Sequence, residues 1–300
     1  MSPDSWTIVF ESPRRGECQE QALVLDALGI PHLIADGSRH GALLLVPAEH
    51  AGRATDELRQ YAAENRRRPP RPDLKLHGYG IPGVAGYALV LVAAFLIEQR
   101  VAFGIDWLAA GGLDGAAVRA GEWWRVITAL TLHADAGHLV ANLVFGAFFG
   151  AFAGQFLGSG IAWATIILAA GAGNAIDLFL LPATHRAIGA STAVFAALGL
   201  IAALMWRAQA NRTATWARRY APLIGASVLL AYIGTGDSRT DAVAHLTGFV
   251  AGLCAGAAYD LRRPRWLESA AVQFLAGLAT LGLLAASWWL AVGAWRTGLA

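Results

Sequence analysis

Residues 189–206 have the sequence GASTAVFAALGLIAALMW, and residues 243–256 have the sequence VAHLTGFVAGLCAG. Both stretches are apolar and free of Asp, Glu, Lys and Arg, the composition of helices that lie in a membrane. Each nevertheless carries polar residues near its start, among them Ser191 in the first and His245 in the second. Polar groups are unfavourable inside a bilayer, so these two positions are candidates for function.

The composition of the whole chain extends this picture. Hydrophobic residues make up 56% of the 300 residues and charged residues only 15%, whereas a soluble domain carries about a quarter charged residues. Residues 1–75 are an exception, because they hold a dense mixture of Arg, Glu and Asp. The net charge of +2 is too small to suggest nucleic acid as a partner. We therefore predict a small soluble domain followed by a body in the lipid bilayer.

The body contains seven apolar segments. Most of them approach the roughly 20 residues needed to cross a hydrocarbon core of about 30 Å, and the fifth is the shortest of the seven. The intervening stretch 99–136 is rich in aromatic residues, which favour the membrane interface. The predicted spans lie near residues 82–98, 137–156, 160–181, 189–206, 221–234, 241–259 and 268–293.

The basic residues predict the orientation of these spans. Three clusters fall on one side of a seven-span arrangement, which the positive-inside bias places in the cytoplasm. The start MSPDSWTIVFESPRRGE has no basic segment followed by an apolar run, so we predict no cleavable signal peptide. We expect a multi-pass protein of the cell (inner) membrane with a cytoplasmic N-terminus and an external C-terminus. The clusters are Arg66, Arg67, Arg68, Arg71 and Lys75; Arg207, Arg212, Arg218 and Arg219; and Arg262, Arg263 and Arg265.

The soluble N-terminal part has its own pattern. Strand-like and amphipathic stretches alternate in a βαββα order, with strands at WTIVFES, PHLIADG and ALLLVPAEH and helices at 17–30 and 52–68. This order predicts a small cytosolic α+β domain, which we interpret as an interaction or regulatory module. The predicted division of the chain is a domain at 1–66, a basic linker at 67–81, a six-span core at 82–260 and a seventh helix within 261–300.

Four polar residues start three of the predicted spans. His138 and Asn142 lie four residues apart, on one face of the second span. Ser191 opens the fourth span, and His245 lies one turn into the sixth. In the predicted topology these three spans run in the same direction, so their N-terminal ends share one depth below the outer surface. We therefore expect the four side chains to meet.

The chemistry of these residue types fits a nucleophilic site. A serine hydroxyl needs an adjacent base, and an imidazole serves as one near neutral pH. The oxyanion formed by attack on a carbonyl needs hydrogen-bond donors that are already aimed at it. Asn142, His138 and the backbone N–H of Ser191 are candidates for that role. Gly189 allows a sharp turn and a close approach of substrate.

Four motifs together resemble the rhomboid family of intramembrane serine proteases. They are Trp124-Arg125 in GEWWR, His138 and Asn142 in HADAGHLVANL, Gly189 and Ser191 in GAST, and His245 in AHLTGFVAG with Gly248 and Gly252. The motifs occur in the family's order and spacing over about residues 80–260. The resemblance implies a rhomboid-like six-helix core, here with an added C-terminal seventh span.

The resemblance also implies roles for residues. Ser191 would be the nucleophile and His245 the general base and acid, with His138 and Asn142 lining the oxyanion hole. Glu122 and Arg125 would brace the outer loop, and His133 would be structural. The substrates would be transmembrane proteins, cleaved in or near their membrane segments, with no metal and no cofactor.

Two positions depart from the commonest family pattern. Thr192 stands where many members have Gly, and Phe195 stands where many have a Tyr that stacks on the catalytic histidine. Neither change removes the Ser–His pair, and both bear on rate and substrate preference.

Each residue also has a purely structural interpretation. A serine at a helix start is often an N-cap, a lone histidine in an apolar span often packs against a neighbour, and a His–Asn pair can link two helices. We assign Gly248, Gly252 and Gly256 to packing of the sixth span against the fourth. We expect Asp177, near the outer end of the third span, to face water or headgroups rather than to orient His245. Neither Cys18 nor Cys254 indicates a disulfide or a zinc site.

Two other functions compete with proteolysis. A rhomboid-like pseudoprotease would bind transmembrane helices without cleaving them, but it would not need both Ser191 and His245. A transporter or channel would use a polar pocket, but the sequence has no inverted repeat and no paired interrupted helices.

Overall fold

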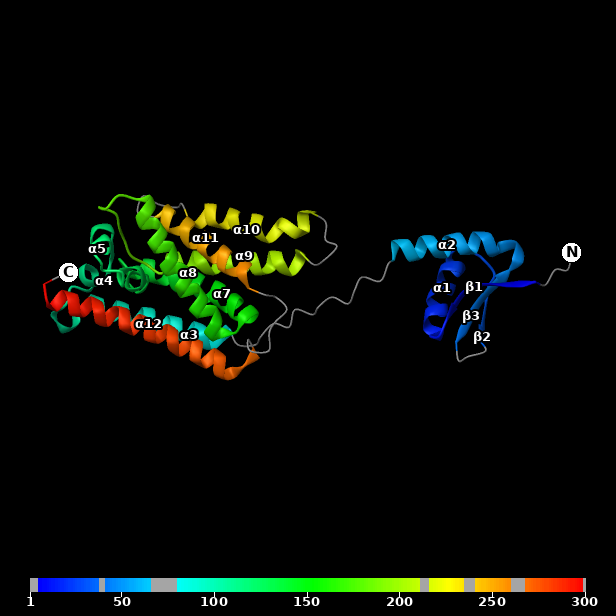
Figure 1. Cartoon of the computed structure of the whole chain (residues 1–300), viewed down its shortest axis with the longest axis horizontal. Coiled ribbons are helices and arrows are strands. Elements are labelled where there is room, and N and C mark those ends of the chain that lie inside the picture. Colours follow the sequence, from blue (N-terminus) through cyan, green and yellow to red (C-terminus); the bar gives the residue numbers. More distant parts are fainter. Residues whose placement is uncertain are drawn as a thin grey trace. The chain divides into compact units, whose positions relative to one another are not determined.

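The computed structural model describes residues 5–37, 41–65, 80–210, 216–234, 241–259 and 268–298. The chain divides into two compact units, Met1–Asp73 and Leu74–Ala300, whose elements are labelled in Figure 1. The predicted basic linker 67–81 lies almost entirely outside the described residues, as do the basic clusters at 66–75 and 262–265.

The N-terminal unit is a three-stranded antiparallel sheet with two helices. Its elements follow the predicted βαββα order, and the sheet order is β1-β3-β2. The central strand β3 alternates between buried and half-buried residues, with Leu44 and Val46 in the small core beside Leu25 and Leu58 of the helices. The elements are β1 (Trp6–Ser12), α1 (Arg15–Ala27), β2 (Leu33–Asp36), β3 (Ala42–Pro47) and α2 (Ala51–Glu64).

The second unit is helical, and seven long helices coincide with the seven predicted apolar segments. Five of them, α3, α7, α8, α9 and α12, are long and apolar enough to cross a membrane. α11 is apolar but has only 17 residues, and α10 carries Arg218 and Arg219 in its first turn and contains Pro222. The helices are α3 (Gly80–Gln99), α7 (Ala136–Leu157), α8 (Ser159–Leu180), α9 (Ser191–Ala210), α10 (Trp216–Gly234), α11 (Ala242–Ala258) and α12 (Ala270–Arg296).

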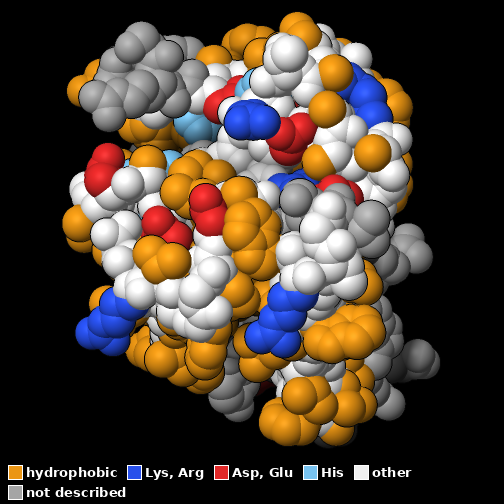
Figure 2. All heavy atoms as spheres, turned by 90° about the vertical axis from the view of Figure 1, so that its left-hand side faces the viewer, with side chains coloured by type: hydrophobic (Ala, Val, Ile, Leu, Met, Phe, Trp, Pro, Cys, Tyr) orange, Lys and Arg blue, Asp and Glu red, His pale blue; other side chains and the backbone are white. Residues whose placement is uncertain are grey.

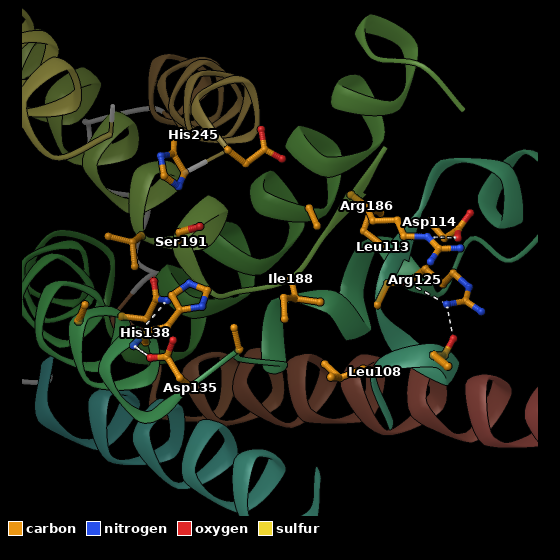
Figure 3. A pocket seen from close by; sticks show the side chains of 18 of the residues that line it. Leu108, Leu113, Asp114, Arg125, Asp135, His138, Arg186, Ile188, Ser191 and His245 are labelled. Atoms are coloured by element: carbon orange, nitrogen blue, oxygen red, sulfur yellow. Dashed lines mark hydrogen bonds and ion pairs between the residues drawn. The ribbon is translucent and has the colours of Figure 1, made fainter. Parts of the chain in front are cut away.

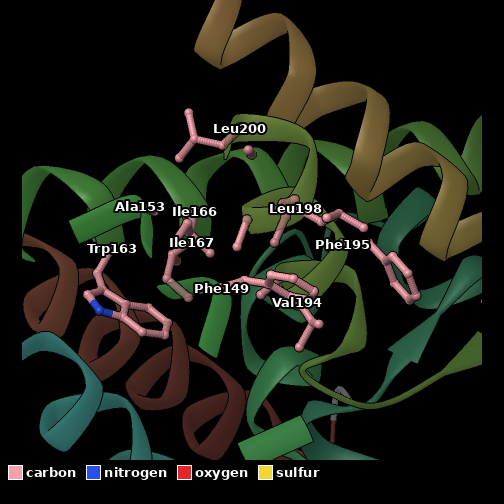
Figure 4. Close-up of a cluster of buried hydrophobic side chains, with 14 of the residues drawn as sticks. Phe149, Ala153, Trp163, Ile166, Ile167, Val194, Phe195, Leu198 and Leu200 are labelled. Carbon is pink, nitrogen blue, oxygen red and sulfur yellow. The ribbon is translucent and has the colours of Figure 1, made fainter. Parts of the chain in front are cut away.

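Helices α8 and α9 form the centre of this unit. α11 packs against both of them, α10 packs against α9, α12 packs against α8, and α7 lies between α3 and the central pair. The core between these helices is filled by Phe149 of α7, Trp163 and Ile166 of α8, and Phe195 and Leu200 of α9 (Figure 4). Many large apolar side chains on the outer helices remain exposed, as expected of a protein whose surroundings are lipid.

The contact between α9 and α11 is made at glycines. A Cβ atom added at Gly248, Gly252 or Gly256 would come closer than 3.0 Å to the backbone of α9, at the carbonyls of Thr192, Ala196 and Leu200 respectively. Small residues allow helix backbones to approach closely in a membrane. The glycine stripe predicted from the sequence therefore lies where the sixth apolar helix presses on the fourth.

The stretch 99–136 folds into short elements rather than an open loop. They are α4 (Trp107–Gly111), β4 (Leu113–Asp114), α5 (Gly115–Arg119) and α6 (Arg125–Thr128), with single 3₁₀ turns at Ala102–Gly104 and Ala129–Thr131. Strand β4 pairs with β5 (Arg186–Ala187), which precedes α9. The stretch thus contacts the segment that leads to Ser191.

Helix α12 is joined to the rest of the body by specific polar contacts. The indole N–H of Trp288 donates to Thr131 Oγ1 at 3.1 Å, and Gln273 Nε2 donates to the carbonyl of Leu157 at 2.8 Å. Gln273 Oε1 also accepts from the N–H of Ile161 at 3.1 Å. The seventh apolar helix is therefore an integral part of the second unit.

Candidate active site

A cavity of about 1080 Å³ lies at the N-terminal ends of α7, α9 and α11, and it is lined by all four polar residues singled out in the sequence. In the view of Figure 3 the side chain of Ser191 lies between the rings of His245 and His138. The three helices therefore begin at one end of the body, as the topology predicted. Figure 2 faces the end with α4 and α5, where histidine, acidic and basic side chains lie among hydrophobic ones.

Ser191 is the first residue of α9 and is half-buried. The chain reaches it through Gly189, whose φ of +127° favours glycine. The N–H of Gly189 donates to the carbonyl of Ala129 at 2.9 Å, which holds the turn against the preceding loop. A Cβ atom at Gly189 would lie 2.7 Å from the His138 ring and 3.7 Å from Ser191 Oγ. Glycine therefore allows the His138 ring to come next to the serine.

His245 lies one turn into α11 and is buried. Its ring faces that of Phe195 on α9, with a centroid separation of 4.4 Å and an interplanar angle of 36°. Since Phe195 is one turn after Ser191, the same helix carries the serine and the ring that packs on His245. Phe195 therefore makes the ring contact with His245 without a tyrosine hydroxyl.

His138 and Asn142 lie on the first turns of α7. Asp135 caps this helix, its Oδ1 accepting from the His138 N–H at 2.8 Å. Asn142 is 5% exposed and its Nδ2 donates to the His138 carbonyl at 3.1 Å. The carbonyl of Asn142 in turn accepts from the Tyr87 hydroxyl at 2.8 Å, which ties α7 to α3. Both residues are held in place by their own helix and its neighbour.

His133 supports the site from behind. It is completely buried, its ring lies edge-to-face with that of His138 at a centroid distance of 5.1 Å, and its Nε2 faces the N–H of Ala190 at 3.5 Å. Burial, together with the charge of His138, lowers the pKa of His133 to about 4. A neutral imidazole accepts a hydrogen bond from Ala190, the residue before Ser191, and this contact suits the structural role that the resemblance implies.

The outer loop is braced by Arg125. This side chain is 4% exposed, its Nε lies 2.6 Å from Glu122 Oε2, and its Nη1 donates to the carbonyls of Ala109 and Gly112 at 2.8 Å. One arginine therefore joins α4, the start of β4 and α6. Trp124, its partner in the motif, has a buried indole nitrogen without a hydrogen-bond acceptor among the described residues.

The sequence analysis did not single out His185 and Asp241, which lie at this end of the body. Asp177 was expected to face water, but it is completely buried, and its carboxylate lies 3.1 Å from His185 Nε2. The same nitrogen lies 2.9 Å from Asp241 Oδ2. Asp241 could have been found as an N-cap four residues before His245, whereas nothing in the sequence marks His185. Asn174, one turn before Asp177, donates to the Val126 carbonyl at 2.9 Å.

Comparison with known proteins finds one matching domain family. Residues 120–261 match the Rhomboid domain. The chain is 31% identical over 159 residues to rhomboid protease GluP of Bacillus subtilis (strain 168). This match covers 51% of this chain and 29% of the relative. It is 32% identical over 150 residues to rhomboid-like protease 3 of Toxoplasma gondii, covering 49% of this chain and 57% of the relative.

A third relative, rhomboid-like protease 2 of Toxoplasma gondii, is 28% identical over 175 residues, which cover 56% of this chain and 59% of the relative. The matches thus span less than two thirds of each relative. The Rhomboid domain match falls on the unit that contains the spanning helices, and it includes Gly189, Ser191 and His245. The chain is therefore a multi-pass membrane protein that carries a rhomboid domain.

Proposed function

We propose that this protein is a serine endopeptidase that cleaves peptide bonds in or near the transmembrane segments of other membrane proteins. The single observation that carries the proposal is the meeting of Ser191, His245, His138 and Asn142 in one cavity at the starts of three helices. A binding protein needs such a cavity but not this set of side chains. The rhomboid proteases named above support the same reaction class.

The proposed reaction has two halves. His245 removes the proton of the Ser191 hydroxyl as Oγ attacks the scissile carbonyl carbon. The resulting tetrahedral oxyanion collapses, the C–N bond breaks, and His245 gives its proton to the leaving amine. Water then attacks the acyl-enzyme ester with His245 again as base, which releases the carboxylate product and restores the serine.

The oxyanion is proposed to form near the first turn of α9. The first N–H groups of a helix have no acceptor within the helix, so the N–H of Ser191, the first residue of α9, is available as a donor. His138 lies against Gly189 at this point. Asn142 at present donates to its own helix, so we propose that its amide turns toward the oxyanion when substrate binds. Phe195 holds the plane of the His245 ring by packing, without the hydroxyl of a tyrosine.

The test is cleavage of a transmembrane substrate in liposomes by the wild type, Ser191→Ala and His245→Ala, together with labelling by a fluorophosphonate probe. We expect both variants to lose cleavage and labelling while their thermal unfolding is unchanged. Ser287→Ala, which alters a buried serine of α12, is the matched control and should remain active. Normal folding of the wild type with no labelling of Ser191 would contradict the proposal and favour a pseudoprotease.

We propose the same division and orientation as the sequence predicted, with a cytoplasmic domain at 1–66, the catalytic core at 82–260 and an external C-terminus after the seventh span. The cavity would then open toward the outer side of the inner membrane. A reporter fused after residue 300 tests this, because phosphatase activity there requires an external position. Activity of a cytoplasmic reporter at the same position would overturn the orientation.

A further inference from the structure

Three charged or titratable side chains from separate segments meet beside the candidate site. Asp177 lies near the end of α8, His185 lies in the segment between α8 and α9, and Asp241 directly precedes α11. The Nε2 atom of His185 is 3.1 Å from Asp177 Oδ2 and 2.9 Å from Asp241 Oδ2. One imidazole nitrogen therefore faces two carboxylates.

The burial of Asp177 makes this contact energetically important. Its side chain is 0% exposed, and a buried carboxylate is strongly unfavourable unless a donor or a positive charge faces it. Two nearby arginines are engaged elsewhere among the described residues. Arg119 donates to the carbonyls of Leu178 and Leu181, and Arg186 pairs with Asp114 at 2.9 Å. His185 is therefore the side chain that offsets the cost of burying the Asp177 carboxylate.

Asp241 connects this contact to α11. Its Oδ1 caps the helix by accepting from the N–H of Ala244 at 3.0 Å, while its Oδ2 faces His185. The backbone of His185 is fixed as well, since its carbonyl accepts from the N–H of Gly115 at 2.9 Å. His185 is thus joined both to the outer elements and to the first turn of α11.

The position of these contacts along the chain relates them to the candidate dyad. His185 lies six residues before Ser191, and Asp241 lies four residues before His245. The contact between them therefore joins the two segments that lead into the serine and the histidine. Asp241 also lines the cavity that contains both.

The distances favour direct contact over a shared metal ion. Ligands on a tetrahedral zinc ion at bond lengths near 2.0 Å are about 3.3 Å apart. The separations of 2.9 and 3.1 Å are shorter than this and lie within ion-pair distance. A metal site is therefore the less favoured explanation, and it is tested below.

We infer that His185, held between Asp177 and Asp241, is a positioning residue that sets the start of α11 and so the place of His245 relative to Ser191. The inference rests on the proposed function. It predicts that loss of the contact slows the chemical step without weakening substrate binding, because His185 and Asp177 are not among the residues that line the cavity. A displacement of about 1 Å at a reacting group lowers rates by roughly a hundredfold.

The variants are His185→Gln, Asp177→Asn and Asp241→Asn in the full chain in liposomes. Asparagine at 241 keeps the helix cap, since its side-chain oxygen accepts the same hydrogen bond, and loses only the charge that faces His185. We expect kcat to fall roughly tenfold to a hundredfold at constant KM, with an equal fall in the rate of fluorophosphonate labelling. The double variant His185→Gln/Asp241→Asn should be no slower than either single variant.

Asp56→Asn is the matched control, because it removes the same charge from an exposed position of α2 in the N-terminal unit and should keep the wild-type rate. Unchanged rates in all three variants, or effects of the two single changes that add in the double variant, would overturn the inference. So would a wild-type rate that depends on Zn²⁺ and is abolished by a chelator, which would assign the cluster to a metal. A wild type that is not labelled at all would instead remove the proposed function.

Discussion

Helices α3 and α9 have the same length of 20 residues, but their surroundings differ completely. In the most apolar stretch of α3 only 17% of the residues are buried, against 72% in α9, although α3 is the more apolar of the two. In a soluble protein the order would be reversed. The observed order is the one expected where lipid surrounds the outer helices, and the helix with more small and polar residues lies at the centre and carries Ser191.

The hydropathy of a helix and the packing of its side chains report different properties of that helix. Apolar composition indicates that a helix enters the membrane, whereas glycine, alanine and a few polar groups indicate where it contacts other helices. α9 touches α11 at Gly248, Gly252 and Gly256, where an added Cβ would collide with backbone. α3 has a comparable backbone contact at its first residue, Gly80, but at Gly86 an added Cβ would meet nothing within 4 Å.

The largest effect is expected from adding one methyl group at Gly252, and the same change at Gly86 serves as the comparison. Gly252→Ala places a Cβ closer than 3.0 Å to the Ala196 carbonyl, so α11 must move away from α9. We expect a loss of about 3 kcal/mol in unfolding free energy, measured by unfolding in detergent, and strongly reduced labelling of Ser191. Gly86→Ala should be neutral. Equal unfolding free energies of the two variants would contradict the close packing at Gly252 and the open space at Gly86.

A smaller effect is expected where α3 does make a polar contact. Tyr87→Phe removes the hydroxyl that donates to the Asn142 carbonyl at 2.8 Å but keeps the ring that stacks on Trp163. We expect a loss of about 1 kcal/mol, because a single interhelical hydrogen bond contributes little more than this. Thermal unfolding of the purified variant measures it. If Tyr87→Phe lowered the unfolding free energy as much as Gly252→Ala, α3 would be bound to the other helices as tightly as α11 is to α9.

The smallest effect is expected on the exposed side of α3. Leu89 is 71% exposed, and Leu89→Ala should change the unfolding free energy by less than about 0.5 kcal/mol and leave cleavage unchanged. Leu200→Ala, at a fully buried position of α9, is the contrasting variant and should cost at least about 2 kcal/mol. A large effect at Leu89 would indicate that a protein surface, rather than lipid, covers this side.

Much of the fold followed from local patterns. The strands and helices of the N-terminal unit were predicted because the alternation around Leu44 and Val46 and the amphipathic spacing around Leu25 are local properties. The apolar helices were predicted because length and composition suffice to identify them. α10 is the exception, since its helix begins five residues before the predicted segment and includes Arg218 and Arg219.

The candidate site was predicted as a set of residues but not as a geometry. The sequence indicated that His138, Ser191 and His245 share one end of the body, because helix direction alternates with each crossing. The structure adds the ring contact of Phe195 on His245 and the role of Gly189 beside His138. These depend on rotamers and on helix separation, which sequence spacing does not specify.

By itself, the sequence determined which segments are apolar helices, in what order they run, and which small residues let α11 approach α9. Only the tertiary structure brought His185 between Asp177 and Asp241 and placed Trp288 against Thr131. Asp241 and Trp288 come from segments far from their partners in the chain, and no periodicity relates any of these contacts. The physical reason is that helical periodicity encodes one face of one helix, whereas a contact among three segments depends on how all of them pack.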